Sequence, residues 1–290
     1  MPRKSPRSRR RNEPKSRVPK SRRSRATPRR ARAKSRHASA TAARRHSPKG
    51  ARPVARRVAA RAKPRTKSPR VARARWKPPE PERVAAVLEL LAGMYPEATT
   101  ALRHENALQL LIATILSAQC TDERVNLVTP SLFARFPDAR ALAEADRAEL
   151  EDLIRSTGFY RNKAKAIQAC CAEIVSQHRG EVPRTLAALT ALRGVGRKTA
   201  NVVLGNAFDV PGLVVDTHVG RVSRRLAFTR EVDPVKVEFA LMEVVPRERW
   251  TIFSHWLILH GRRLCIARKP RCSLCPLLPH CPRIGVMASQ

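Results

Sequence analysis

Most of the excess positive charge of this 290-residue chain lies in its first 80 residues, and this constrains what they can fold into. They hold 31 of the 59 Lys and Arg residues but only two of the 23 acidic residues, which gives a net charge of +29 there and +7 in the rest. Ser, Pro and Ala separate the basic residues, and aromatic residues are scarce. Such a segment cannot bury enough apolar surface to offset the entropy of ordering. We therefore expect a disordered basic arm over residues 1–80 and a folded part from Pro81 onward.

The expected partner of the arm is a polyanion. Each phosphate that Lys or Arg neutralises releases counterions, so such binding is independent of sequence and sensitive to salt. Basic turns recur at Ser5-Pro6-Arg7, Thr27-Pro28-Arg29, Ser47-Pro48-Lys49 and Ser68-Pro69-Arg70. They either enter a minor groove or belong to a solvated tail that raises the local DNA concentration, and we favour the tail. An organelle transit peptide is a further alternative, but the frequent prolines disfavour the amphipathic helix that it needs.

No apolar run in the sequence reaches the roughly 18–20 residues that span a bilayer, and the start lacks the apolar core of a secretory signal. We expect an intracellular protein with no membrane partner. The Ala/Arg/Pro-rich composition indicates a GC-rich bacterial genome, and hence the cytoplasm and nucleoid. In a reducing compartment, seven cysteines favour metal binding over a disulfide framework.

From Pro81 onward, apolar residues recur at helical spacing, most densely over Asn106–Ser117. No alternating strand pattern persists beyond a few residues. The sequence therefore predicts an all-α fold, and about 210 residues suffice for two small helical lobes. The predicted helices are Arg83–Met94, Asn106–Ser117, Asp122–Arg135, Arg147–Ser156, Asn162–His178, Lys198–Phe208, Thr217–Leu226, Pro234–Val244 and Glu248–Gly261. Helix N-caps are expected at Asp146, Asp216 and Asp233.

A turn with two glycines joins the helical segment Thr185–Leu192 to the helix that starts at Arg197, which makes a helix–hairpin–helix unit. Glycine lets a phosphate approach the backbone closely and tolerates positive φ. The following helix adds free N–H groups and the positive end of its dipole. Gly-x-Gly alone is a weak signal, but Arg197 and Lys198 follow directly and favour nucleic acid. The candidate DNA-binding residues are Gly194, Val195, Gly196 and Arg197.

Lys198 is a candidate nucleophile. It must lose its proton to react, which requires partial burial or cationic neighbours, and Arg197 beside it is one such neighbour. Asp216 closes the apolar run Val214-Val215 and is a carboxylate that could activate the lysine. The structural alternative for Asp216 is a simple helix N-cap, which is compatible with catalysis.

Four cysteines lie within 17 residues with the spacing C-x6-C-x2-C-x5-C. They are Cys265, Cys272, Cys275 and Cys281. Sites of four thiolates suit zinc or an iron–sulfur cluster, and the spacing alone leaves both open. The other cysteines, Cys120, Cys170 and Cys171, fall in helical patterns and are expected to be buried thiols.

Together these motifs resemble the endonuclease III family of DNA glycosylases. Matching segments run in the expected order over about residues 81–285 and include Leu116–Gln119, Gly158–Tyr160, Val182-Pro183 and His255–Arg262. The resemblance implies a six-helix barrel domain at 100–210 with the helix–hairpin–helix. It also implies an iron–sulfur cluster domain made of 81–99 and 211–290, in which the four cysteines hold a [4Fe–4S] cluster. The implied partner is damaged double-stranded DNA, and we expect a monomer.

The resemblance also implies a mechanism in which the damaged nucleotide is flipped into a pocket between two lobes. Lys198 would attack C1′ of the sugar and expel an oxidised pyrimidine, and β-elimination would then cleave the strand 3′ to the abasic site. Asp216 would deprotonate Lys198 or stabilise positive charge on the sugar. Gln119 matches the position that inserts toward the orphaned base, and Asp122 is a further pocket candidate.

This sequence departs from the family at two positions. Phe159 occupies the second wedge position, where a leucine is frequent in bacterial members. It either wedges into the DNA or packs inward as an ordinary aromatic side chain. Arg193 stands where a proline is common, and we expect DNA binding to survive that change.

Three alternatives compete with this function. The adenine-removing branch lacks the lysine and carries a further C-terminal domain, whereas this chain has Lys198 and ends soon after the cysteines. The 8-oxoguanine branch keeps the lysine but generally lacks the cysteine loop. A non-catalytic iron–sulfur DNA-binding protein would fit the basic arm but does not explain Lys198 and Asp216. We therefore expect a bifunctional DNA glycosylase and lyase.

Overall fold

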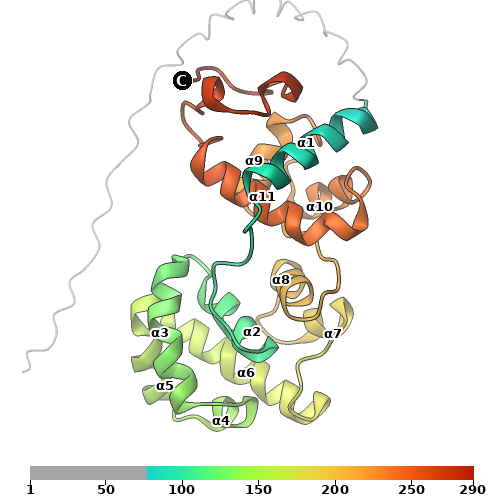
Figure 1. Cartoon of the computed structure of the whole chain (residues 1–290). Helices are drawn as coiled ribbons and strands as arrows, with labels where there is room; N and C mark the ends of the chain where they lie inside the picture. The colour runs from blue at the N-terminus through green and yellow to red at the C-terminus, as the bar shows by residue number, and fades with distance from the viewer. Residues whose placement is uncertain (1–76) are drawn as a thin grey trace, which may run out of the picture. The chain divides into compact units, whose positions relative to one another are not determined.

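The computed structural model describes residues 77–290, so the arm expected at 1–80 lies outside the described residues except for its last four (Figure 1). Within residues 77–290 the regular structure is helical and no strand forms, which confirms the all-α prediction. The α-helices are α1 (Pro81–Met94), α2 (Ala107–Leu116), α3 (Asp122–Arg135), α4 (Ala139–Glu144), α5 (Arg147–Ile154), α6 (Tyr160–His178), α7 (Leu186–Ala191), α8 (Arg197–Ala207), α9 (Thr217–Arg225), α10 (Pro234–Met242) and α11 (Trp250–Arg263). Short 3-10 turns are η1 (Arg155–Thr157), η2 (Arg247–Arg249), η3 (Cys272–Leu274) and η4 (Leu278–His280).

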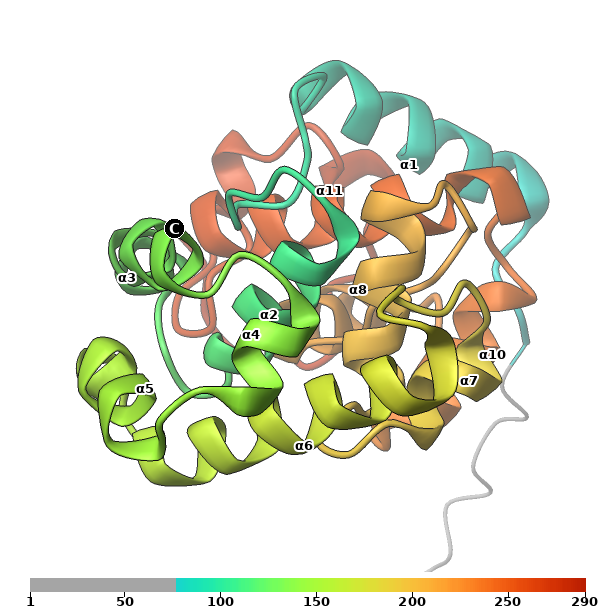
Figure 2. The same ribbon diagram turned by 90° about the horizontal axis from the view of Figure 1, so that it is seen from below.

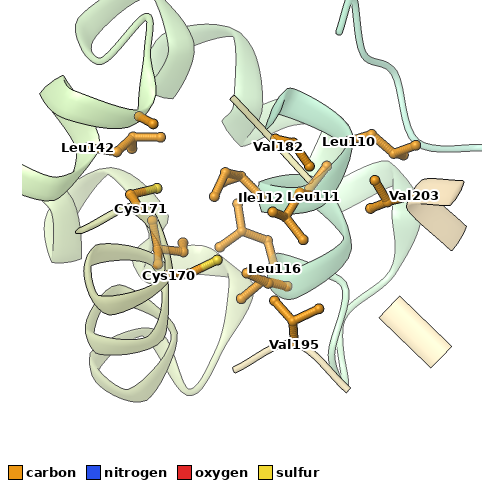
Figure 3. Close-up of a cluster of buried hydrophobic side chains, with 14 of the residues drawn as sticks. Leu110, Leu111, Ile112, Leu116, Leu142, Cys170, Cys171, Val182, Val195 and Val203 are labelled. Carbon is orange, nitrogen blue, oxygen red and sulfur yellow. The ribbon is translucent and has the colours of Figure 1, made fainter. Parts of the chain in front are cut away.

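Helix α2 is the centre of the first hydrophobic core. Its residues from Leu110 to Leu116 are all buried. A helix that is buried on every side needs neighbours on every side, and α3, α6 and α8 pack around it (Figure 2). Figure 3 shows its side chains among Leu142 of α4, Cys170 of α6 and Val203 of α8. We call the part of the chain built on this core, residues 102–210, lobe A.

A second core brings α1 together with α9, α10 and α11. Figure 1 shows α1 packed on α11. The Arg83 guanidinium fixes this arrangement by donating to the carbonyl oxygens of Leu226 at 2.8 Å and His280 at 3.0 Å. We call residues 84–98 and 213–277 lobe B. Both lobes belong to one compact unit of the chain.

The predicted helix caps at Asp146, Asp216 and Asp233 are confirmed. Each carboxylate accepts a hydrogen bond from a backbone N–H three residues later, at distances of 2.8–3.0 Å. The periodicity missed α4, because this six-residue helix is too short to show an apolar stripe. Among the described residues, no helix combines the length and apolarity that crossing a membrane requires.

Two of the three remaining cysteines are buried as predicted, and one is not. Cys170 and Cys171 are fully buried in α6, and burial raises the pKa of Cys170 to about 12. Cys120 was expected in a helix, but α2 ends at Leu116 and α3 starts after its N-cap Thr121. Cys120 therefore lies in the turn between the two helices and is only half-buried.

Because α2 is central to the core, shortening one of its buried side chains should destabilise the protein. Leu111→Ala should lower the free energy of unfolding by roughly 2–5 kcal/mol, because it leaves a cavity in a core that cannot fully collapse. The matched control is Leu127→Ala in α3, where the leucine is 69% exposed and the change should be below about 0.5 kcal/mol. Urea unfolding of both variants measures the difference. Equal losses would contradict the central role of α2.

Candidate active site between the two lobes

Lys198 and Asp216 line the same cleft, whose walls come from both lobes. The cleft holds about 1380 Å³ of empty space, part of it open to solvent. An adjoining hollow of about 770 Å³ shares both residues. The polar side chains that line the cleft from lobe A are Ser117, Gln119, Asp122 and Lys198, and those from lobe B are Asp216, Thr217, His218, Arg224 and Arg262.

Lys198 is the second residue of α8, directly after the glycine turn. Gly196 is the N-cap of this helix and no side chain caps it, so amides of the first turn remain available to an anion. Gly194 has φ of 80°, and a Cβ there would come within 2.9 Å of the Ala166 Cβ. Glycine is therefore required at 194 for both its conformation and its packing. Val195 is buried and its N–H donates to the Leu192 carbonyl, so that amide is already paired.

The Arg197 side chain is bound to lobe B. Its Nε donates to the Glu238 carboxylate at 2.8 Å, and its guanidinium lies over the Phe239 ring. The Glu238 carboxylate is 5% exposed, and its other oxygen accepts from the Asn201 amide at 2.9 Å. This buried network joins α8 to α10. In this arrangement Arg197 is an interlobe contact, and its role in binding DNA stays a prediction.

Asp216 is both a helix cap and a residue of the cleft. Its Oδ1 accepts from the Val219 N–H at 2.8 Å, which fixes the start of α9. The segment before it is held on α11, because the Val214 N–H donates to Ser254 Oγ at 2.9 Å. The carboxylate is half-buried and lines the cleft. The capping alternative from the sequence is thus observed, and it holds Asp216 at the cleft that Lys198 also lines.

Partial burial or a cationic neighbour would favour the free amine of Lys198. Lys198 is exposed, and Arg197, the cationic neighbour expected from the sequence, donates to Glu238. The other guanidinium groups in the cleft belong to Arg224 and Arg262. Arg262 donates to Asp122 at 2.9 Å, an ion pair that joins lobe B to lobe A across the cleft.

Gln119 and Phe159 lie on two separate loops of lobe A, and both are exposed. Their φ angles are 53° and 47°, left-handed values that few residues other than glycine adopt. Phe159 is 64% exposed, so it does not pack inward as the structural alternative required. Both side chains border one hollow of about 690 Å³, together with Lys163 and Gly194.

The four cysteines of the loop line a single cavity with an empty volume of about 410 Å³. The rest of its wall is mainly apolar and includes Val222, Leu226, Leu264, Leu277 and Leu278. Burial and the neighbouring thiols raise the pKa of Cys275 to about 11. A guanidinium N–H of Arg225 donates to the Cys265 sulfur at 3.2 Å. Within residues 77–290, no three Cys, His, Asp or Glu side chains are arranged to hold one metal ion together.

Comparison with known proteins identifies the family. Residues 112–247, which include Lys198 and Asp216, match the HhH-GPD superfamily of base excision DNA repair proteins. Endonuclease III of Synechocystis sp. is 54% identical over 202 residues, which cover 69% of this chain and 92% of that protein. The chain belongs to the endonuclease III family. This confirms the resemblance seen in the sequence and makes the chain a base excision repair enzyme of the DNA glycosylase/lyase class.

Solved structures of endonuclease III share the fold. A non-covalent endonuclease III–DNA complex is 46% identical with a TM-score of 0.67, and the match covers 70% of this chain and 96% of that one. A trapped endonuclease III–DNA covalent intermediate, an estranged-adenine complex, has the same identity, TM-score and coverage.

Two buried charged residues near the cleft were missed in the predictions from the sequence. Glu238, which binds Arg197, is an isolated acid between Val237 and Phe239, and an acid in such surroundings is a signal of a buried ion pair. Lys163 lies on the helix face that buries Ile167 and Ile174, where a lysine is equally unexpected. Glu238 binds Arg197, 41 residues away, and one of the two carbonyls that Lys163 binds is 47 residues away, so local pattern could not reveal these contacts.

The double role of Asp216 can be separated by substitution. Asp216→Ala should lower the free energy of unfolding by about 1 kcal/mol, because the Val219 N–H loses its acceptor. Asp216→Asn keeps an acceptor oxygen of the same shape and should retain most of that stability. Denaturant unfolding of the two variants is the measurement, and equal losses would show that the cap contributes nothing.

Proposed function

We propose that this protein removes oxidised pyrimidines from damaged duplex DNA and then cleaves the strand 3′ to the abasic site, acting as a monomer. The proposal rests on one observation. Lys198 of lobe A and Asp216 of lobe B line the same cleft. The related structures support it, because their titles describe endonuclease III in a complex with DNA and in a trapped covalent intermediate with DNA.

The chemistry follows from a lysine amine and a carboxylate that face the same space. The Lys198 Nζ forms a bond to C1′ of the sugar as the bond from C1′ to the base nitrogen breaks, and the base leaves with the bonding pair. Loss of a proton from nitrogen and ring opening give an imine, which acidifies the C2′ hydrogen. Removal of that proton expels the 3′ phosphate in a β-elimination, and water then releases the lysine. Asp216 stabilises the positive charge that develops on the sugar.

Lysine attacks only as the free amine. Because Lys198 is exposed, we infer that bound DNA excludes water from the cleft. Asp216, which lines the same cleft, would accept the proton. Closure of the site by the substrate would therefore supply the partial burial that favours the free amine.

DNA binding is assigned to the hairpin and to the two exposed loops. The uncapped amides at the start of α8, together with Gly194 and Gly196, would bind a backbone phosphate. Gln119 and Phe159 would fill the gap that the flipped nucleotide leaves in the stack. Their exposure supports this role, because a wedge must reach the duplex.

We propose that Cys265, Cys272, Cys275 and Cys281 hold a [4Fe–4S] cluster. Four soft sulfur ligands around one cavity suit such a cluster, which is larger than a single zinc ion. The apolar wall and the Arg225 guanidinium beside the Cys265 sulfur fit a buried group with negatively charged ligands. When bound, the cluster would give this loop a rigid fold and present Arg268, Lys269 and Arg271 to DNA phosphates.

The nucleophile is tested by borohydride trapping on duplex DNA that contains an oxidised pyrimidine. The wild type should form a covalent adduct, and Lys198→Gln should form none while its strand cleavage falls by about 10³-fold or more. Lys236→Gln removes an exposed lysine outside the cleft lining and is the matched control, with normal trapping. An adduct of undiminished yield in Lys198→Gln would assign the nucleophile to another residue. No adduct in the wild type would favour a monofunctional or non-catalytic protein.

Metal analysis tests the cluster. Protein purified without oxygen should contain about four iron atoms and as many acid-labile sulfides per chain, with visible absorbance from iron–sulfur charge transfer. Cys275→Ser should lower the iron content, whereas Cys120→Ser, outside the cavity, should leave it unchanged. One zinc per chain without sulfide would contradict the proposal.

A further inference from the structure

Lys163 is a buried lysine that the proposed chemistry does not use. It lies in the first turn of α6 and is 5% exposed. Its ammonium donates to the Leu116 carbonyl at 2.7 Å and to the Thr157 carbonyl at 2.8 Å. Burial lowers the pKa of Lys163. A buried charge is tolerated only where hydrogen bonds replace its water, and here two backbone carbonyls do so.

The two acceptors lie at the bases of the two exposed loops. Leu116 is the last residue of α2, three residues before Gln119. Thr157 is the last residue of η1, two residues before Phe159. Both carbonyls stand at helix ends, where intrahelical partners are missing and the helix dipole favours a cation. One side chain thus joins two loops that are about forty residues apart in sequence.

Both loops also have a backbone that needs support. Gln119 and Phe159 have left-handed φ angles, and neither is a glycine. Such conformations cost free energy and persist where the surrounding structure imposes them. Lys163 borders the hollow between these two residues and binds backbone within three residues of each. It is therefore placed to impose the separation of the two loops.

We propose that Lys163 is a positioning residue whose ammonium holds the Gln119 and Phe159 loops at a fixed separation, so that both side chains enter the duplex together. This inference rests on the wedge role assigned to those residues under the proposed function. It predicts a selective defect. A stacked damaged base must be extruded before it is removed, whereas an abasic site has no base to unstack, so its cleavage depends less on the wedges.

The experiment compares two lysines of the same helix. Lys163→Met keeps the aliphatic length but removes both hydrogen bonds, and Lys165→Met removes an exposed lysine two residues away. Under single-turnover conditions, Lys163→Met should remove an oxidised pyrimidine from duplex DNA roughly 10- to 100-fold more slowly, as expected for misplaced groups. Its cleavage of a preformed abasic site should stay within about threefold of the wild type. Lys165→Met should match the wild type on both substrates.

A double-mutant cycle separates positioning from general destabilisation. If Lys163 acts through the wedge, Lys163→Met should add little to the defect of Phe159→Ala. An equal loss on the damaged base and the abasic site, or a full additional loss in the Phe159→Ala background, overturns the proposal. If Lys163→Met does not fold, Lys163→Arg replaces it, because a wider guanidinium changes the loop separation and should give the same selective loss.

Hydrogen exchange tests the contact without relying on catalysis. Lys163→Met should increase amide exchange in residues 117–120 and 157–160 together, and Lys165→Met should not. Unchanged exchange in both loops overturns the proposal. A wild type that is inactive on both DNA substrates would refute the proposed function, while the exchange result would still decide whether Lys163 holds the loops.

Discussion

The geometry of the active site depends on one buried carboxylate. Glu238 of α10 binds Arg197 and Asn201, which flank Lys198 on α8. The Asn201 amide also donates to the Leu213 carbonyl at 3.0 Å, in the segment that leads to Asp216. Removing one partner of such a buried network leaves an uncompensated charge or polar group, at a cost of about 3–5 kcal/mol for a buried ion pair. Glu238 therefore fixes the helix that carries Lys198 against the lobe that carries Asp216.

The segment between α8 and α9 shows how closely the two lobes approach. At Gly212 a Cβ would lie 2.9 Å from the Asn201 carbonyl oxygen, so only glycine lets the chain cross α8 at this distance. The Gly212 N–H donates to Thr251 Oγ1 of α11 at 3.3 Å. The chain is thus held on both sides before it reaches Asp216. Because the chain passes so close to α8 at Gly212, the position of Asp216 can shift little.

The sequence predicted what depends on local pattern. The buried helix α2 was readable from its apolar spacing, and the caps were readable because an N-cap and its donor are three residues apart. The buried contacts were not readable. Lys163 binds a carbonyl 47 residues away, and Arg197 binds a carboxylate 41 residues away. No periodicity encodes such pairs, so the sequence could assign Arg197 only by its neighbours, the glycines and Lys198, and not by its partner.

Three basic side chains around the cleft have different roles because their surroundings differ. Arg197 is neutralised by a buried acid and connects the lobes, and Lys163 is buried and bound to two carbonyls. Lys198 is exposed, on a helix whose neighbouring residues are held in place. The contacts of Arg197 hold α8 in place, and those of Lys163 hold the Gln119 and Phe159 loops. The Lys198 side chain extends from this fixed helix and is exposed. The proposed nucleophile must bond to C1′ and later be released, and an exposed Lys198 side chain keeps the rotational freedom that these two steps require.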